Sequence, residues 1–111
     1  MTNNERTKII RALNDQLRRQ HVGGHVMLTP GIRALGNAVV ADLLAEIARF
    51  DGISAGNDPY EEHDCATLVY AGKRVIWKID YYDRQMTCGS PDPADANVTE
   101  RVMTVMLEGE Y

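Results

Sequence analysis

The chain has 111 residues, of which 44% are hydrophobic and 25% are charged, and its formal net charge is −4. This length and composition are typical of one globular domain over residues 1–111, and they exclude a disordered or fibrous chain. The acidic balance disfavours a general nucleic-acid binder, because such proteins normally carry a basic surface.

The charge is divided unequally along the chain. Residues 1–36 carry six Lys and Arg against two acidic residues, a balance of +4, whereas residues 37–111 carry six against fourteen, a balance of −8. This division predicts either a polarised field that steers a partner or two separate solvated faces.

Targeting signals are not visible in the sequence. The first five residues are polar and no signal-peptide core follows them, and no apolar run approaches the roughly 20 residues that span a bilayer. Two cysteines, Cys65 and Cys88, do not make a disulfide framework. We therefore expect a cytoplasmic protein with reduced thiols.

The first half of the chain predicts helices on either side of a short strand. Thr2 and Glu5 have the spacing of a capping box, which predicts a helix from there to about Gln20. A short strand follows at residues 25–28, and Thr29-Pro30-Gly31 then resembles a helix cap with proline in the first turn. Apolar residues at helical spacing predict a further helix from about Ala38 to Phe50.

The second half predicts strands and a closing helix. After a loop from Ile53 to Glu62, the runs 65–70 and 74–82 predict a hairpin around Ala71-Gly72, with Trp77 on its core face. A third strand is expected at Gln85–Gly89. The last helix, capped by Asp92 or Asp95, would have four residues on its inner face: Val98, Val102, Val105 and Met106.

These elements together predict an α+β fold. Their order is α-β-α-β-β-β-α, with three helices packed on a mainly antiparallel sheet of about four strands.

Most side chains able to do chemistry fall between residues 57 and 93. An acidic group surrounds His63, and its members are Asp58, Glu61, Glu62, Asp64, Asp80 and Asp83. Carboxylates and an imidazole suit a hard divalent cation, but their spacing matches no defined metal motif. The alternative is a solvated acidic loop whose carboxylates cap backbone amides.

Two further groups of residues have a functional and a structural interpretation. Cys65 and Cys88, with His63 nearby, could form a nucleophilic site, but a strand cysteine is more often a small buried hydrophobe. Four tyrosines have the amphipathic character that is favoured at protein interfaces, or they complete the core: Tyr60, Tyr70, Tyr81 and Tyr82.

Several motifs resemble the DUF3768 family of small bacterial proteins. They are LTPG at 28–31, NDPY at 57–60, EHD at 62–64, WKIDYYD at 77–83 and GSPDPAD at 89–95, together with IRALND at 10–15. The resemblance covers nearly the whole chain and implies an uncharacterised protein of alphaproteobacteria and their plasmids or mobile elements. It supplies no activity, cofactor, metal or catalytic residue. Cys65 and Cys88 depart from the family pattern, which further disfavours a catalytic thiol.

Two functions remain as expectations. The first is a small acidic binding protein that contacts a protein partner. The partner could be a nucleic-acid-binding protein whose binding site is occupied by the acidic surface of this chain. The link to mobile elements makes an anti-restriction or anti-CRISPR inhibitor, or a regulator, a natural example. Its contact residues would be Asp58, Tyr60, Glu61, Glu62, His63, Asp64, Asp80, Tyr82 and Asp83. The second is a small metal-dependent hydrolase, or another enzyme, built on four of these residues: His63, Asp64, Asp80 and Asp83.

Overall fold

The computed structural model describes residues 1–53 and 56–111. The elements in chain order are α1 (Asn3–Gln20), β1 (His25–Leu28), α2 (Pro30–Arg33), α3 (Asn37–Arg49), β2 (Cys65–Tyr70), β3 (Lys73–Tyr82), the 3-10 helix η1 (Ala96–Val98), β4 (Glu100–Leu107) and the 3-10 helix η2 (Glu108–Glu110). The α+β class is confirmed. Part of the predicted loop from Ile53 to Glu62, residues 54 and 55, lies outside the described residues.

The predicted helix ends are close to the observed ones. At the start of α1 the Thr2 hydroxyl oxygen accepts a hydrogen bond from the Glu5 amide at 3.1 Å, as a capping box requires. At α2 the expected cap is different, because the Thr29 side chain makes no capping bond. The Glu110 carboxylate instead accepts from the Gly31 amide at 2.9 Å and from the Thr29 hydroxyl at 2.6 Å.

The four strands form a mixed sheet in the order β1-β4-β3-β2. β3 pairs antiparallel with β2 and with β4, whereas β1 pairs parallel with β4. The chain turns into β1 at Gly24, where a Cβ atom would lie 2.6 Å from the Arg101 carbonyl oxygen, so only glycine allows this approach.

Two predictions for the last part of the chain are wrong. Residues 85–89 form a turn, in which Gly89 makes an isolated bridge to Tyr82, and not a strand. The last long segment, residues 100–107, is the strand β4 and not a helix. The observed order is therefore α-β-α-α-β-β-β, apart from the two 3-10 helices.

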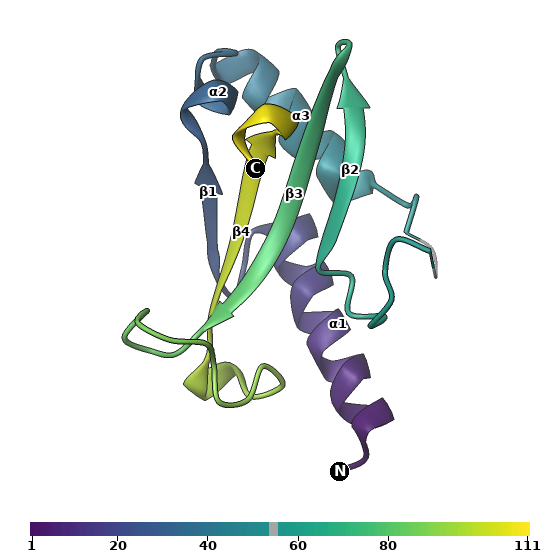
Figure 1. Ribbon diagram of the computed structural model, residues 1–111, viewed down its shortest axis with the longest axis vertical. Helices are drawn as coiled ribbons and strands as arrows, with labels where there is room; N and C mark the ends of the chain where they lie inside the picture. The colour runs from purple at the N-terminus through teal and green to yellow at the C-terminus, as the bar shows by residue number, and fades with distance from the viewer. Residues whose placement is uncertain (54–55) are drawn as a thin grey trace.

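The molecule has two layers, with the long helices α1 and α3 packed together on one face of the sheet (Figure 1). Leu17, Leu43 and Ile47 from the helices pack against Trp77 and Val105 of the sheet, and all five are fully buried. The predicted core position of Trp77 is thereby confirmed. None of the helices in the described ranges combines the length and the apolar character needed to cross a membrane.

Candidate functional site

The sheet face opposite α1 and α3 is built from alternate residues of β3 and its neighbours. Because side chains alternate along a strand, the buried residues Val75, Trp77 and Ile79 face the helices, and Lys78 and Tyr82 face the other way. The pairing register brings Thr104 of β4 beside Lys78, and Met27 of β1 beside Thr104. We call this surface, which lies opposite α1 and α3, the open face.

A hollow of about 850 Å³ lies on the open face beside β1 and β4. Its lining residues are His25, Met27, Leu28, Thr29, Tyr82, Arg84, Met86, Glu100, Val102 and Thr104. Two exposed methionines stand at its rim, Met27 with 51% and Met86 with 48% of its surface accessible. Unbranched methionine side chains adapt to different apolar partners.

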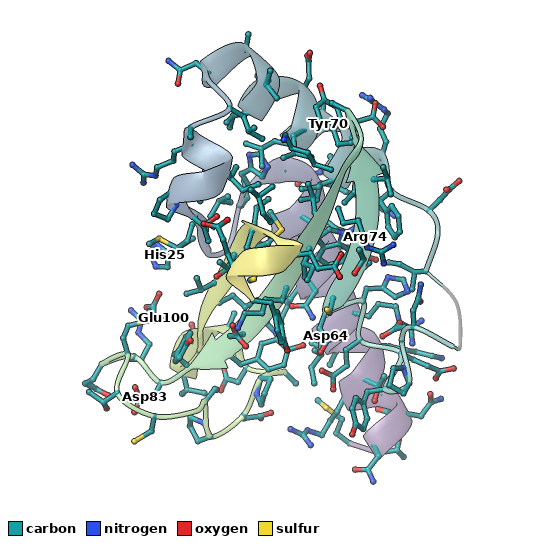
Figure 2. The ribbon with its side chains drawn as sticks, turned by 45° about the horizontal axis from the view of Figure 1, so that its top comes forward. His25, Asp64, Tyr70, Arg74, Asp83 and Glu100 are labelled. Atoms are coloured by element: carbon teal, nitrogen blue, oxygen red, sulfur yellow. The ribbon has the colours of Figure 1, made fainter. Side chains whose placement is uncertain are left out.

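Charged groups in the hollow are balanced among themselves. The Glu100 carboxylate lies 3.1 Å from His25 Nε2 and 3.3 Å from Arg84 Nε. Figure 2 shows His25 and Glu100 on the same side of the molecule, with Asp83 beyond them. The hollow therefore offers an apolar surface with an internally paired charge.

The predicted residue Asp83 shapes one wall of this hollow. Its carboxylate accepts a hydrogen bond from the Thr87 amide at 2.9 Å, and this bond is the main cause of its lowered pKa. The Met86 amide in turn donates to the Asp83 carbonyl at 3.0 Å, in a turn where Met86 has a φ of 61°. Asp83 thus holds the turn that presents Met86.

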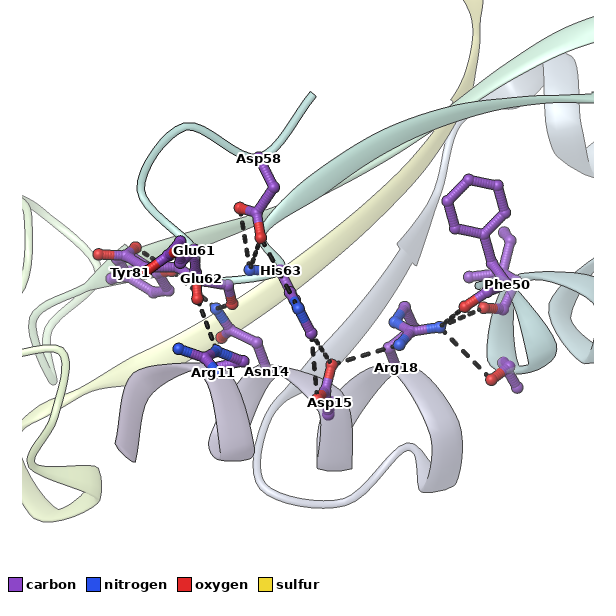
Figure 3. A network of polar contacts seen from close by, with 12 residues as sticks. Arg11, Asn14, Asp15, Arg18, Phe50, Asp58, Glu61, Glu62, His63 and Tyr81 are labelled. Atoms are coloured by element: carbon purple, nitrogen blue, oxygen red, sulfur yellow. Dashed lines mark hydrogen bonds and ion pairs between the residues drawn. The ribbon is translucent and has the colours of Figure 1, made fainter. Parts of the chain in front are cut away.

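The acidic loop before β2 is attached to α1 through His63 (Figure 3). His63 Nδ1 lies 2.9 Å from an Asp15 oxygen, and His63 Nε2 lies 3.7 Å from Asp58 Oδ2. Asp58 is buried and its carboxylate also accepts from the His63 amide at 3.2 Å. The same Asp15 oxygen, Oδ1, also pairs with the buried Arg18 at 3.2 Å. His63 therefore sits between two carboxylates as a structural link.

A second group of polar side chains, centred on Asn14, holds the same acidic loop against α1. Asn14, fully buried in α1, donates to the Tyr81 hydroxyl at 2.7 Å and to the Glu62 carbonyl at 3.0 Å, while its own oxygen accepts from Arg101 at 2.8 Å. The Tyr81 hydroxyl donates to the Glu62 carboxylate at 2.8 Å. Burial strongly raises the pKa of Tyr81 and lowers the pKa of Arg101.

A known family matches the part of the chain that contains the motifs between residues 28 and 95. The model of a family described as "Protein of unknown function (DUF3768)" matches residues 28–110. The chain belongs to the DUF3768 family. This confirms the resemblance read from the motifs. No curated protein and no solved structure matches the chain.

The predicted acidic cluster of this DUF3768 chain is divided between different parts of the fold. Asp80 pairs with Lys78 at 2.9 Å on the open face, and Asp83 caps its own turn. Figure 2 shows Asp83 and Asp64 well apart. Within residues 1–53 and 56–111, no group of three or more His, Cys, Asp or Glu side chains is arranged to hold a metal ion.

The remaining predicted residues lie on exposed or half-buried surface. Tyr60 is 73% exposed, Glu61 is exposed and Tyr82 lines the hollow. Asp64 is half-buried, and burial with its neighbouring carboxylates raises its pKa. Cys65 and Cys88 are free thiols, and Cys88 lies in the turn after β3 and not on a strand beside Cys65.

The residues of α1 that hold the acidic loop were not identified from the sequence, and neither were Met27 and Met86 of the hollow. The sequence does contain a signal for the α1 residues. Asn14 and Arg18 follow Ile10 at intervals of four residues, so they occupy the helix face that the apolar stripe assigns to the core. Polar residues at core positions require buried partners, and those partners are the loop carbonyls and carboxylates.

Proposed function

We propose that this DUF3768 protein is a binding domain that acts by contact with a protein partner. The observation that carries the proposal is the open face, where an apolar hollow rimmed by Met27 and Met86 lies on the sheet surface opposite α1 and α3. Apolar patches of this kind, bordered by polar residues, mark interaction sites on soluble proteins.

The positions of the reactive side chains favour binding over hydrolysis. His63 and Asp58 are used to join the loop to α1, Asp83 caps a turn, and Asp80 is paired with Lys78. Each of these contacts serves the fold. A hydrolase would need several of them to converge on one substrate.

The proposed partner is a cytoplasmic protein that handles nucleic acid. The balance of −8 in residues 37–111 supports this class, because an acidic surface can occupy a site built for phosphates. An enzyme of restriction or CRISPR defence is an example of such a partner, and the DUF3768 chain would then act as its inhibitor or regulator.

Capture of partners from a lysate of the native host, with two matched baits, tests the proposal. Met27→Asp places a charge at the rim of the hollow, and Val22→Asp places the same charge at an equally exposed residue after α1; Met27 is 51% and Val22 is 52% exposed. We expect the wild type and Val22→Asp to retain one partner that Met27→Asp loses. Retention of the same partner by Met27→Asp would contradict the open face as the docking site.

A further inference from the structure

The strand β2 presents main-chain hydrogen-bonding groups away from the sheet. Tyr70 and Lys73 pair across a two-residue turn in which Ala71 and Gly72 both have positive φ, 50° and 78°. In such a hairpin the residues beside the turn exchange both hydrogen bonds, and bonded pairs then alternate along the strands. The bond from the Ile79 amide to the Asp64 carbonyl, at 2.7 Å, fits this alternation. The N–H and C=O groups of residues 65, 67 and 69 therefore point outward from β3.

This edge has none of the usual protection. β2 is the last strand of the sheet order, and its six residues, CATLVY, include no charge and no proline. Among the residues that the structure describes, none bonds to the outward groups of Thr67 or Val69. The opposite edge is different, because β1 has four residues and Arg33 Nε donates to its Leu28 carbonyl at 3.2 Å.

The two ends of β2 carry opposite charge. Glu61, Glu62 and Asp64 precede the strand, and Lys73 and Arg74 follow its turn. Across the described ranges, neither Lys73 nor the Glu61 carboxylate has an ion-pair partner. An antiparallel copy of the same strand would place its basic end beside the acidic end of the first.

We propose that two copies of this chain dimerise by antiparallel pairing of β2 with β2. Centred on Thr67, the pairing sets Thr67 opposite the partner's Thr67 and Cys65 opposite the partner's Val69. The three outward residues of each strand then exchange about six hydrogen bonds, and the two sheets become one. This edge lies across the sheet from the hollow, so the dimer leaves the hollow free.

The two-fold symmetry of the proposed dimer provides the test, because a charged side chain at residue 67 would lie directly opposite the same side chain of the second copy. Thr67→Lys and Thr67→Glu each place like charges directly opposite one another, which should weaken self-association up to about fivefold. An equal mixture of the two variants should recover the dimer as a heterodimer. Thr67→Val at the same site, and Val22→Lys elsewhere, should dimerise like the wild type.

Sedimentation velocity over a range of concentrations, in reducing buffer, measures each variant, and urea unfolding checks that each is folded. Amide hydrogen exchange of the wild type gives a second measurement: we expect the Thr67 and Val69 amides to become protected as the concentration rises, while the inward Leu68 amide stays unchanged. A wild type that remains monomeric at millimolar concentration would overturn the proposal. So would a Thr67→Lys variant that dimerises as the wild type does, or a mixture of the charged variants that stays monomeric.

Discussion

Arg18 shows how one buried residue closes the core. Its guanidinium carbon lies 5.3 Å from the centre of the Trp77 ring, and the Phe50 ring meets the same indole edge-on at 6.3 Å. The guanidinium also donates to the Ile47 carbonyl at 2.8 Å and to the Phe50 carbonyl at 3.1 Å. One cation therefore stacks on the core aromatic and donates to carbonyls at the end of α3, where it is a second donor to Ile47, which also accepts from the Phe50 amide at 3.2 Å.

Replacing Trp77 tests this packing. Trp77→Ala should lower the free energy of unfolding by roughly 3–5 kcal/mol, because it removes the largest fully buried side chain and leaves a cavity. Urea unfolding followed by circular dichroism measures the loss. Trp77→Phe is the control and should cost less, since Trp77 Nε1 has no hydrogen-bond partner among the described residues. An alanine variant as stable as the wild type would contradict the core position.

Asn14 is expected to matter more than its size indicates. Asn14→Ala leaves the buried Arg101 without its side-chain acceptor and the Tyr81 hydroxyl without a donor. Each unsatisfied buried group costs about 1–3 kcal/mol, so thermal and urea unfolding should show a large loss. Tyr81→Phe removes the hydroxyl alone and should cost less. Equal stability of Asn14→Ala and wild type would show that water replaces the amide.

The two thiols should differ in reactivity. Burial, together with the charge of Asp64, raises the pKa of Cys65, whereas Cys88 is exposed. Less thiolate forms at Cys65 near pH 8, so alkylation followed by mass spectrometry should label Cys88 first. An unlabelled species, lighter by the two hydrogens lost in a disulfide, would contradict our expectation that both thiols are reduced.

Among the elements, α2 depends on a carboxylate from the far end of the chain. The Thr29 hydroxyl and the amides of Leu107 and Gly31 lower the pKa of Glu110 below its ordinary value of 4.5. A lowered pKa in the folded state stabilises the protein above the unfolded value, and this contribution is lost as the pH falls through the folded value. Glu110→Gln should therefore be less stable than wild type at pH 7, with the difference closing below about pH 4.5. Unfolding curves from pH 3 to 7 test this, and a constant difference over that range would contradict it.

The elements also show what sequence periodicity can and cannot predict. α1, α3 and the hairpin were predicted because each has one buried face, so their apolar residues recur at 3.6 or 2.0 positions. β4 is a central strand and is buried on both faces; its sequence, ERVMTVML, is nearly continuous in apolar residues. Such a run contains helical spacing by chance, at Val102, Val105 and Met106, and Val98 of η1 extends the same spacing.

At the scale of the whole molecule, the candidate site is formed by contacts between residues that are far apart in the sequence. The acidic loop was identified correctly as rich in polar groups, but the partner of His63 is Asp15, 48 positions away. The hollow depends on β1 lying parallel to β4, which no local pattern indicates. Side-chain types were therefore predictable, and their neighbours were not.

The exposed Glu61 and the half-buried Asp64 and Asp80 should act together if the proposed binding depends on charge. Neutral substitutions at Glu61, Asp64 and Asp80, made singly, should each reduce partner binding slightly, and the triple variant should lose most of it in a salt-dependent way. Binding of the captured partner at two ionic strengths measures this. Complete loss from Asp80→Asn alone, with the fold intact, would instead favour a decisive catalytic or contact residue.

The position of β4 sets the order in which the protein can fold during synthesis. β4 leaves the ribosome after the other three strands of the sheet, yet it lies between β1 and β3 and hydrogen-bonds to both. Until it emerges, β1 has no neighbour in the sheet and the β2-β3 hairpin shows an unpaired inner edge. Such contacts between distant segments make folding slow and leave strand edges open to other chains. We therefore expect the newly made chain to need protection by chaperones until residue 107 is free.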